Sequence, residues 1–167
     1  MAALKKIKTS GGKVIIVASG NPSDLRYPAH PQRVLNCIRD YNIEDRFIFL
    51  GMIPYQHIMP LMRISAGVVN PSFCEGWSTT VEEAKAIGVP LIISDLPIHR
   101  EQTGGGASFF NPEDPTDIAR VLEGAWEKLM PGPRLACETR ACVLHDERRR
   151  EFAKAFEFIA KRTVQES

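Results

Sequence analysis

Two apolar runs separated by a helical segment constrain the fold of this chain most strongly. The first run covers residues 64–69 and stops at Asn70-Pro71, a pair that ends a strand. A helical segment follows over residues 79–87, and Gly88 is suited to close it. The second run covers residues 89–94. This order predicts a strand–loop–helix–strand unit whose loop lies at the carboxyl ends of the strands, where open α/β sheets bind ligands.

The remainder of the chain repeats this alternation. Strands are expected over residues 14–18 and 46–50, and helices over residues 32–41 and 56–63. Asp114 is expected to cap a further helix that begins with proline. The stripe of that helix expected to face the core comprises Ile118, Val121, Leu122, Ala125, Trp126 and Leu129. We therefore predict an α/β fold with a Rossmann-like, doubly wound parallel sheet.

The predicted domain covers residues 1–130, and residues 131–167 are predicted to be a linker and a C-terminal helix. Proline and glycine at residues 130–133 break the preceding helix. Apolar residues then recur at helical spacing over residues 152–160. The sequence leaves open whether this last helix packs on the domain or contacts another domain or chain.

Composition limits the classes of partner. The chain has 167 residues, an apolar fraction of 44% and a net charge of +1, which suit one globular core and offer no basic field for nucleic acid. No apolar run approaches the length of a membrane span and no secretion signal follows the first methionine, so this chain does not indicate membrane contact, and we expect a cytoplasmic protein. The four cysteines lack the paired spacing of a metal site, and we expect free thiols and no metal: Cys37, Cys74, Cys137 and Cys142.

The loop after Asn70 carries the residue types of an anion and sugar site. Backbone amides of the first helical turn, together with the helix dipole, favour a phosphate. Glu75 and Glu83 would repel a phosphate, and they are better suited to accept hydrogen bonds from hydroxyl groups on either side of it. A sugar, a diphosphate and a ribose in a row would satisfy this arrangement.

A structural alternative exists for part of this pattern. Thr80 with Glu83, and Thr79 with Glu82, each have the spacing of a capping box, in which the glutamate bonds to the backbone at the helix start. Glu75 lies before these caps, so the alternative does not account for it.

The stretch from Glu75 to Ala84 resembles the E-x7-E motif of retaining glycosyltransferases with the GT-B fold, the group 1 superfamily related to glycogen and sucrose synthases. The usual form there is Pro-Ser, two residues, Glu-Gly-Phe-Gly, four residues and Glu-Ala. This chain has Pro71-Ser72, then Glu75-Gly76-Trp77-Ser78, then Glu83-Ala84. The resemblance extends over residues 3–130 through an "F-L-G" turn, "A-x-G-x-P-V-I", "E-x-V-x-x-G" and "P-x-D". These four segments correspond to residues 47–54, 86–92, 101–106 and 111–115.

The resemblance implies a nucleotide-sugar-binding domain, the C-terminal half of a GT-B fold. Glu75 would be the catalytic residue that contacts the donor sugar, and Glu83 would hold the ribose. The donor would be a UDP-, GDP- or ADP-sugar bound without a metal or other cofactor. Backbone amides that would hold the diphosphate belong to Gly76, Trp77, Ser78, Thr79 and Thr80. Backbone that would contact the base belongs to Met52, Ile53 and Pro54.

Departures from the family pattern are also visible. Ser78 stands where glycine is usual, and Thr79-Thr80 replace an apolar residue and proline. The first strand, its Arg/Lys diphosphate clamp and the acceptor-binding N-terminal domain are expected to lie outside this chain, since Lys5 and Lys6 fall in the helix after that turn. The C-terminal helix of such enzymes often crosses to that missing domain.

Three other interpretations stay open on the sequence. One is a sugar-nucleotide epimerase fragment, which shares the GT-B architecture. Another is a non-catalytic module that binds sugar nucleotides or proteins. A flavodoxin-like domain is disfavoured, because no acidic cluster or flavin-type phosphate loop follows the first strand.

Overall fold

The apolar runs form short parallel strands in the computed structural model, which describes residues 1–21 and 29–165. The strands of the described residues are β1 (Ile16–Ala18), β2 (Phe47–Phe49), β3 (Val68–Asn70), β4 (Leu91–Ser94) and β5 (Ser108–Phe110). β1 pairs with β2, and a second sheet has the order β3-β4-β5, with every pairing parallel. The predicted α/β fold with parallel strands is confirmed, and the sheet is divided into two pieces.

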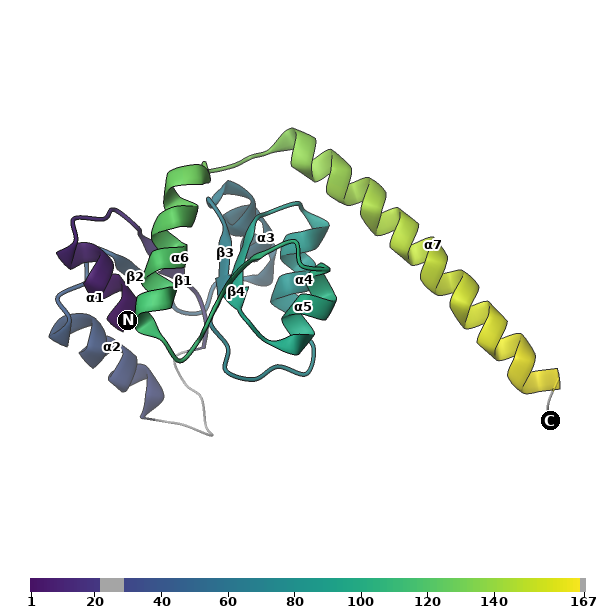
Figure 1. Cartoon of the computed structure of the whole chain (residues 1–167), viewed down its shortest axis with the longest axis horizontal. Coiled ribbons are helices and arrows are strands. Elements are labelled where there is room, and N and C mark those ends of the chain that lie inside the picture. The colour runs from purple at the N-terminus through teal and green to yellow at the C-terminus, as the bar shows by residue number, and fades with distance from the viewer. Residues whose placement is uncertain (22–28, 166–167) are drawn as a thin grey trace.

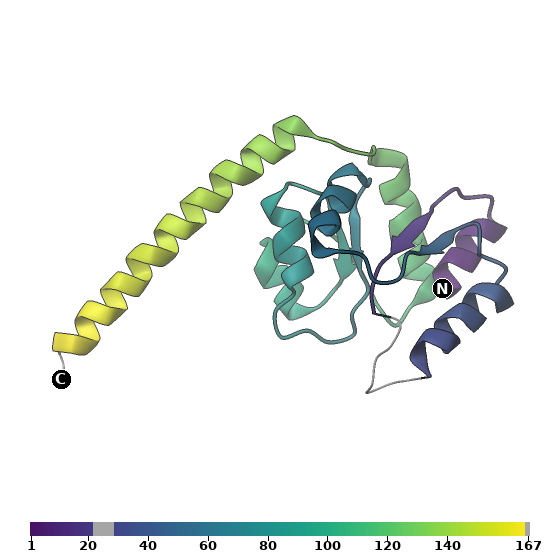
Figure 2. The ribbon, with the colours of Figure 1, turned by 180° about the vertical axis from the view of Figure 1, so that it is seen from behind.

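Helices connect the strands and cover both faces of the larger sheet. Within the described residues they are α1 (Ala2–Thr9), α2 (His30–Asp40), α3 (Tyr55–Ile64), α4 (Thr79–Ala86), α5 (Pro97–Thr103), α6 (Pro115–Lys128) and α7 (Leu135–Gln165). α6 lies against one face, and α3, α4 and α5 lie on the opposite face, as the two opposed views show (Figures 1 and 2). Helices on both faces of a parallel sheet are the doubly wound arrangement that the sequence predicts.

β4 is the centre of the core because both of its faces are buried. Ile92 packs with Phe110 in a cluster that α1 and α6 complete. Leu91 and Ile93 point to the other face and pack in a second cluster with α4. A continuous apolar run buried on both sides is typical of a parallel strand between two helical layers.

The first apolar run is divided between a helix and a strand, which corrects the predicted strand bounds. Ile64 is the last residue of α3, and β3 begins only at Val68. Ser65 accounts for the difference, because its amide donates to the carbonyls of Leu61 and Met62, both at 3.2 Å. These bonds close the helix inside the apolar run, and the chain must turn before it can extend.

The prediction for Trp126 is wrong. Leu122 and Ala125 of α6 are buried as expected, but Trp126 is 43% exposed. An α-helix turns by about 100° per residue, which places Trp126 roughly 80° around the axis from Ile118, at the margin of the core-facing stripe. A large ring at the margin of a stripe stays partly in solvent.

α7 contacts the domain only through its first turns and then extends away from it as a long rod (Figure 1). Gly88, at φ +65°, permits the contact, because a β-carbon there would lie 2.5 Å from the carbonyl oxygen of Cys137. Arg63 Nε lies 2.8 Å from Glu138 Oε1. Side chains over residues 142–163 are exposed, including the apolar residues predicted around Phe152. No helix in the described part of the chain is long and apolar enough to cross a membrane.

Candidate functional site

The predicted site residues gather in the loop that joins β3 to α4. This loop leaves β3 at its carboxyl end, and the next strand, β4, ends beside it and leads into α5. Phe73, Cys74, Gly76 and Trp77 are exposed, whereas Glu75 is half-buried. The loop therefore presents its tip to solvent and holds one carboxylate close to the protein.

Glu75 is held by two polar side chains at the end of β3. Its Oε1 lies 2.6 Å from Ser72 Oγ and 3.4 Å from Asn70 Nδ2. Ser72 Oγ also lies 2.8 Å from Asn70 Oδ1, but one hydroxyl proton can serve only one of these acceptors at a time. Both of these contacts use Oε1, so the other carboxylate oxygen of Glu75 has no partner among the described residues. That oxygen is available to a ligand.

Ser78 is the N-cap of α4, and the predicted threonine caps are wrong. Ser78 Oγ accepts a bond from the amide of Val81 at 3.4 Å and another from Asn70 Nδ2 at 2.9 Å. Thr79 and Thr80 are the first two residues of the helix, so neither can close a capping box. Ser78 takes the cap because Asn70, buried at the end of β3, holds its hydroxyl in place.

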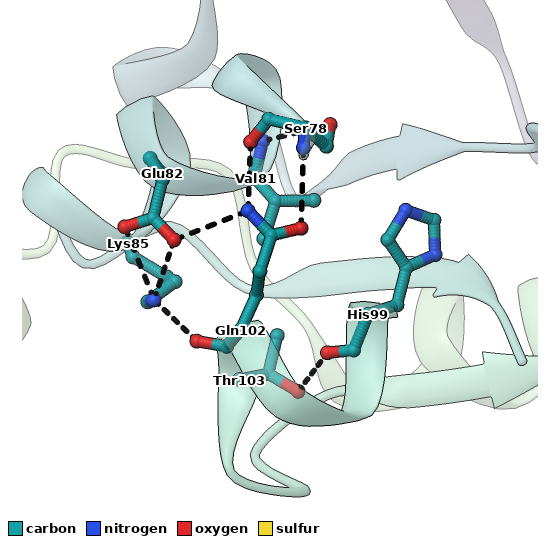
Figure 3. Close-up of polar contacts among 7 residues, drawn as sticks. All are labelled: Ser78, Val81, Glu82, Lys85, His99, Gln102 and Thr103. Carbon is teal, nitrogen blue, oxygen red and sulfur yellow. Dashed lines mark hydrogen bonds and ion pairs between the residues drawn. The ribbon is translucent and has the colours of Figure 1, made fainter. Parts of the chain in front are cut away.

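Gln102 of α5 fixes the position of the α4 start from the other side. Its Oε1 accepts from the Ser78 amide at 3.3 Å, and its Nε2 donates to the Ser78 carbonyl at 3.1 Å and to Glu82 Oε1 at 3.2 Å (Figure 3). Lys85 Nζ pairs with Glu82 at 3.0 Å and also donates to the Gln102 carbonyl. The Ser78 amide is therefore already satisfied, which differs from the expectation that it faces a diphosphate.

α5 is itself anchored under the site by a buried histidine. His99 is fully buried, and its Nδ1 lies 2.8 Å from the carbonyl oxygen of Ser94 (Figure 3 shows the ring). Thr103 Oγ1 donates to the His99 carbonyl at 2.8 Å. His99 Nε2 has no partner among the described residues. The contact between His99 and Ser94 ties the helix that carries Gln102 to the end of β4.

Glu83 makes a contact that the sequence did not suggest. Tyr55 Oη donates a hydrogen bond of 2.8 Å to Glu83 Oε1. The same bond, together with the charge of Glu83, raises the pKa of Tyr55, so the phenol keeps its proton. Tyr55 directly follows Met52, Ile53 and Pro54, and Pro54 is the N-cap of α3. The structure thus brings the predicted base-binding loop next to the predicted ribose ligand.

Unbonded backbone amides complete the site. In the described part of the chain, Thr79 and Thr80 amides donate to no protein group, and Gly76 and Trp77 amides likewise lack an acceptor. A β-carbon added at Gly76 would meet no atom within 4 Å, so the space before the helix is open. Lys5 and Lys6 are exposed on α1, and Lys5 lies over the Tyr41 ring. An anion here would be bound by amides and the helix dipole.

Metal ligands do not converge in the part of the chain that the structure describes: no three His, Cys, Asp or Glu side chains are placed to hold an ion. All four cysteines are free.

Four residues that support the candidate site were not selected as site residues from the sequence: Tyr55, Asn70, Ser72 and Gln102. Asn70 and Ser72 carried a usable signal, because polar residues that directly follow a buried strand lie at the ligand-binding edge of a parallel sheet. Gln102 and Tyr55 carried none, since they are 24 and 28 residues from their partners along the chain.

Comparison with known proteins gives consistent matches. The family of group 1 glycosyl transferases matches residues 1–128. The O-antigen chain mannosyltransferase RfbU of Salmonella typhimurium (strain LT2) is 32% identical over 75 residues, which is 45% of this chain and 21% of that protein. The serotype-specific mannosyltransferase WbdA of Escherichia coli is 31% identical over 108 residues, or 62% of this chain and 13% of that protein.

Two solved structures share the fold over nearly the whole chain. The α,α-trehalose 6-phosphate synthase of Burkholderia multivorans superposes with a TM-score of 0.65 at 15% identity, covering 99% of this chain and 40% of that one. The sucrose-phosphate synthase of Thermosynechococcus elongatus gives a TM-score of 0.52 at 18% identity, covering 92% and 43%. The chain therefore spans less than half the length of every one of these relatives.

Proposed function

Because the chain belongs to the group 1 glycosyl transferases, we propose that it is the donor-binding part of a retaining enzyme that transfers a sugar from a nucleoside diphosphate sugar to an acceptor. One observation supports this most. Glu75 is fixed through Oε1 by Ser72 and Asn70, and Asn70 also holds the cap of α4. A carboxylate and a helix N-terminus are thus locked to one another by a shared side chain.

Each part of this arrangement has a role in the proposed reaction. The free oxygen of Glu75 accepts hydrogen bonds from the donor sugar, and Glu83 accepts them from the ribose. The amides of Gly76, Trp77, Thr79 and Thr80 surround the diphosphate, with Ser78 holding the helix start instead of contacting the ligand. Backbone at residues 52–54 contacts the base.

Electrostatics at the start of α4 favour departure of the nucleoside diphosphate. Negative charge accumulates on the diphosphate as the bond to the sugar breaks, and oriented amides stabilise such charge without reorganising. This contribution replaces that of a metal ion in the proposed mechanism. The departing diphosphate takes the proton of the acceptor, so no separate base is required.

The whole protein is proposed to contain an acceptor-binding domain that precedes this chain. A further strand is proposed to lie between β1 and β3, because a doubly wound sheet has its first strand between the second and the fourth. That strand would lead into α1 by the right-handed crossover that parallel strands adopt. Without an acceptor domain the chain by itself is not expected to transfer sugar.

Mannose donors are the first to test, since both curated relatives are mannosyltransferases. The experiment measures thermal stability of the chain with UDP, GDP and ADP and with their sugars, GDP-mannose included. A ligand that binds the folded chain raises its stability by RT ln(1 + [L]/Kd). No shift with any of these at millimolar concentration would contradict the proposal.

Glu75→Ala tests the assignment of the sugar site. A hydrogen bond to a charged group contributes about 1.5–3 kcal/mol, so the variant should lose affinity for a nucleotide sugar by about tenfold or more. Its affinity for the nucleotide alone should stay unchanged. Glu44→Gln, an exposed carboxylate before β2 at the opposite end of the strands, is the matched control. Equal binding of the sugar nucleotide by wild type and Glu75→Ala would remove Glu75 from the site.

A further inference from the structure

Tyr55 joins the start of α3 to α4 beside the candidate site. It is the first residue of α3, which follows the loop after β2, and its hydroxyl reaches Glu83 on α4 at 2.8 Å. Tyr55 is 69% exposed, and Glu83 is half-buried. An exposed hydrogen bond of this kind adds little to the stability of a fold, so its position beside the site is the more informative property.

The hydrogen bond leaves the carboxylate able to bind a ligand. A carboxylate has about four acceptor positions on its two oxygens. Tyr55 occupies one position on Oε1, and no other partner of Glu83 exists among the described residues. Glu83 can therefore still accept hydrogen bonds from two vicinal hydroxyl groups of a ligand. Tyr55 donates its single hydroxyl proton to Glu83. This hydrogen bond restricts the orientation of the carboxylate plane.

Orientation matters because a free glutamate side chain must be ordered when it binds. Loss of side-chain freedom on binding weakens affinity, and a side chain held in its bound arrangement avoids most of that loss. The residues just before Tyr55 also favour this role, since residues 52–54 are at the same edge and Met52 is highly exposed.

We propose that Tyr55 is a positioning residue that orients Glu83 for the 2′ and 3′ hydroxyls of a nucleoside diphosphate. This inference rests on the proposed function and extends it to a residue outside the loop between β3 and α4. Tyr55 itself need not touch the ligand. Its effect is transmitted through the carboxylate and should be specific to the ribose.

The test compares Tyr55→Phe with wild type by calorimetric titration of the full chain. Titrants are the nucleoside diphosphate that binds best and its 2′,3′-dideoxy form. Tyr55→Phe should weaken binding of the ribose form by about two- to tenfold and leave binding of the dideoxy form unchanged. Tyr41→Phe is the control, because Tyr41 ends α2 and lies against Lys5. On a Glu83→Ala background, Tyr55→Phe should cause no further loss.

The other outcomes overturn either the positioning role of Tyr55 or the proposed function. Equal affinity of wild type and Tyr55→Phe for the ribose form would overturn the positioning role alone. An equal loss for the ribose and dideoxy forms would also overturn it, since Tyr55 would then act through the base or the fold. Absence of binding by the wild type to any nucleoside diphosphate would overturn the proposed function and this inference with it.

Discussion

The two sheets of the domain differ in how completely they are buried. Ile93 in the middle of β4 is fully buried, whereas Ile48 in the middle of β2 is 44% exposed. Ile15 and Val17, which flank Ile16 at the start of β1, are exposed to a similar extent. The β3-β4-β5 half has helices on both faces, and the β1-β2 half is covered by α1 and α2 on one face only.

The candidate site lies almost entirely on the more deeply buried half of the sheet. The carboxylates and the amides of the candidate site all belong to the well-buried half, where Asn70 and Gln102 fix the loop and helix start. The β1-β2 half contributes only the loop of residues 52–54, which follows β2 and leads into Tyr55 at the start of α3. A ligand site needs supporting side chains that do not move, and these are available where the sheet is buried on both faces.

Truncation of one isoleucine in each half should give the largest difference in stability between the two halves. Ile93→Ala should lower the free energy of unfolding by about 2–5 kcal/mol, because it leaves a cavity in a packed core. Ile48→Ala should lower it by about 1 kcal/mol or less, since half of that side chain is already in solvent. Urea denaturation of both variants measures the difference. Equal losses would show that the exposed face of the β1-β2 half is covered in solution.

A smaller loss of stability is expected when the polar network of the buried half is disrupted. Asn70→Ala leaves the Ser78 hydroxyl and Glu75 without a shared donor, and a buried polar group that loses its partner costs about 1–3 kcal/mol. Asn36→Ala on exposed α2 is the matched control and should change stability by less than about 0.5 kcal/mol. Urea denaturation compares the two variants. An Asn70→Ala variant as stable as the control would show that the loop does not depend on this residue.

The sequence was sufficient for the parts of the fold that follow from local patterns. Apolar runs and turn residues predicted the parallel α/β arrangement, Asp114 capped α6 as expected, and Gly88 ended α4 with a positive φ. The predicted start of β3 was less accurate, because Ser65 closes α3 inside an apolar run. Periodicity also overestimated the burial of Trp126, since it gives the direction of a side chain but not the width of the core.

The sequence predicted the loop of the candidate site but not the side chains of other helices that hold it in place. Glu75 and the start of α4 follow from residues adjacent in the chain, so spacing alone places them together. Gln102 holds Ser78 from another helix, and Tyr55 holds Glu83 from another. Such pairs depend on how helices pack against one another, and the spacing of residues along the sequence does not predict that packing. The Ser78 cap shows the same limit, because a buried asparagine decided which of three adjacent hydroxyl residues would take it.

Acid should have the smallest effect on stability, and β2 should respond to it more than β4. Asp45, which precedes β2, bonds to Lys8 at 2.6 Å, and this bond lowers the pKa of Asp45 below its ordinary value of 3.8. A lowered pKa in the folded state means that the pair stabilises the fold above pH 3.8 and that this contribution is lost as the pH falls through the lower value.

In the other half, a bond from Arg100 lowers the pKa of Asp95 in the same direction. We expect amide-exchange protection of β2 to decrease slightly on acidification, while protection of β4, all of whose residues are buried, decreases less. Lys8→Met should reduce the pH dependence in β2 and shift the carboxyl titration of Asp45, followed by NMR, towards 3.8, while Arg46 Nε remains 3.1 Å from Asp45 Oδ2. Equal pH dependence of β2 and β4 would mean that the halves unfold as one unit, because a surface pair can weaken one sheet selectively only if the two open separately.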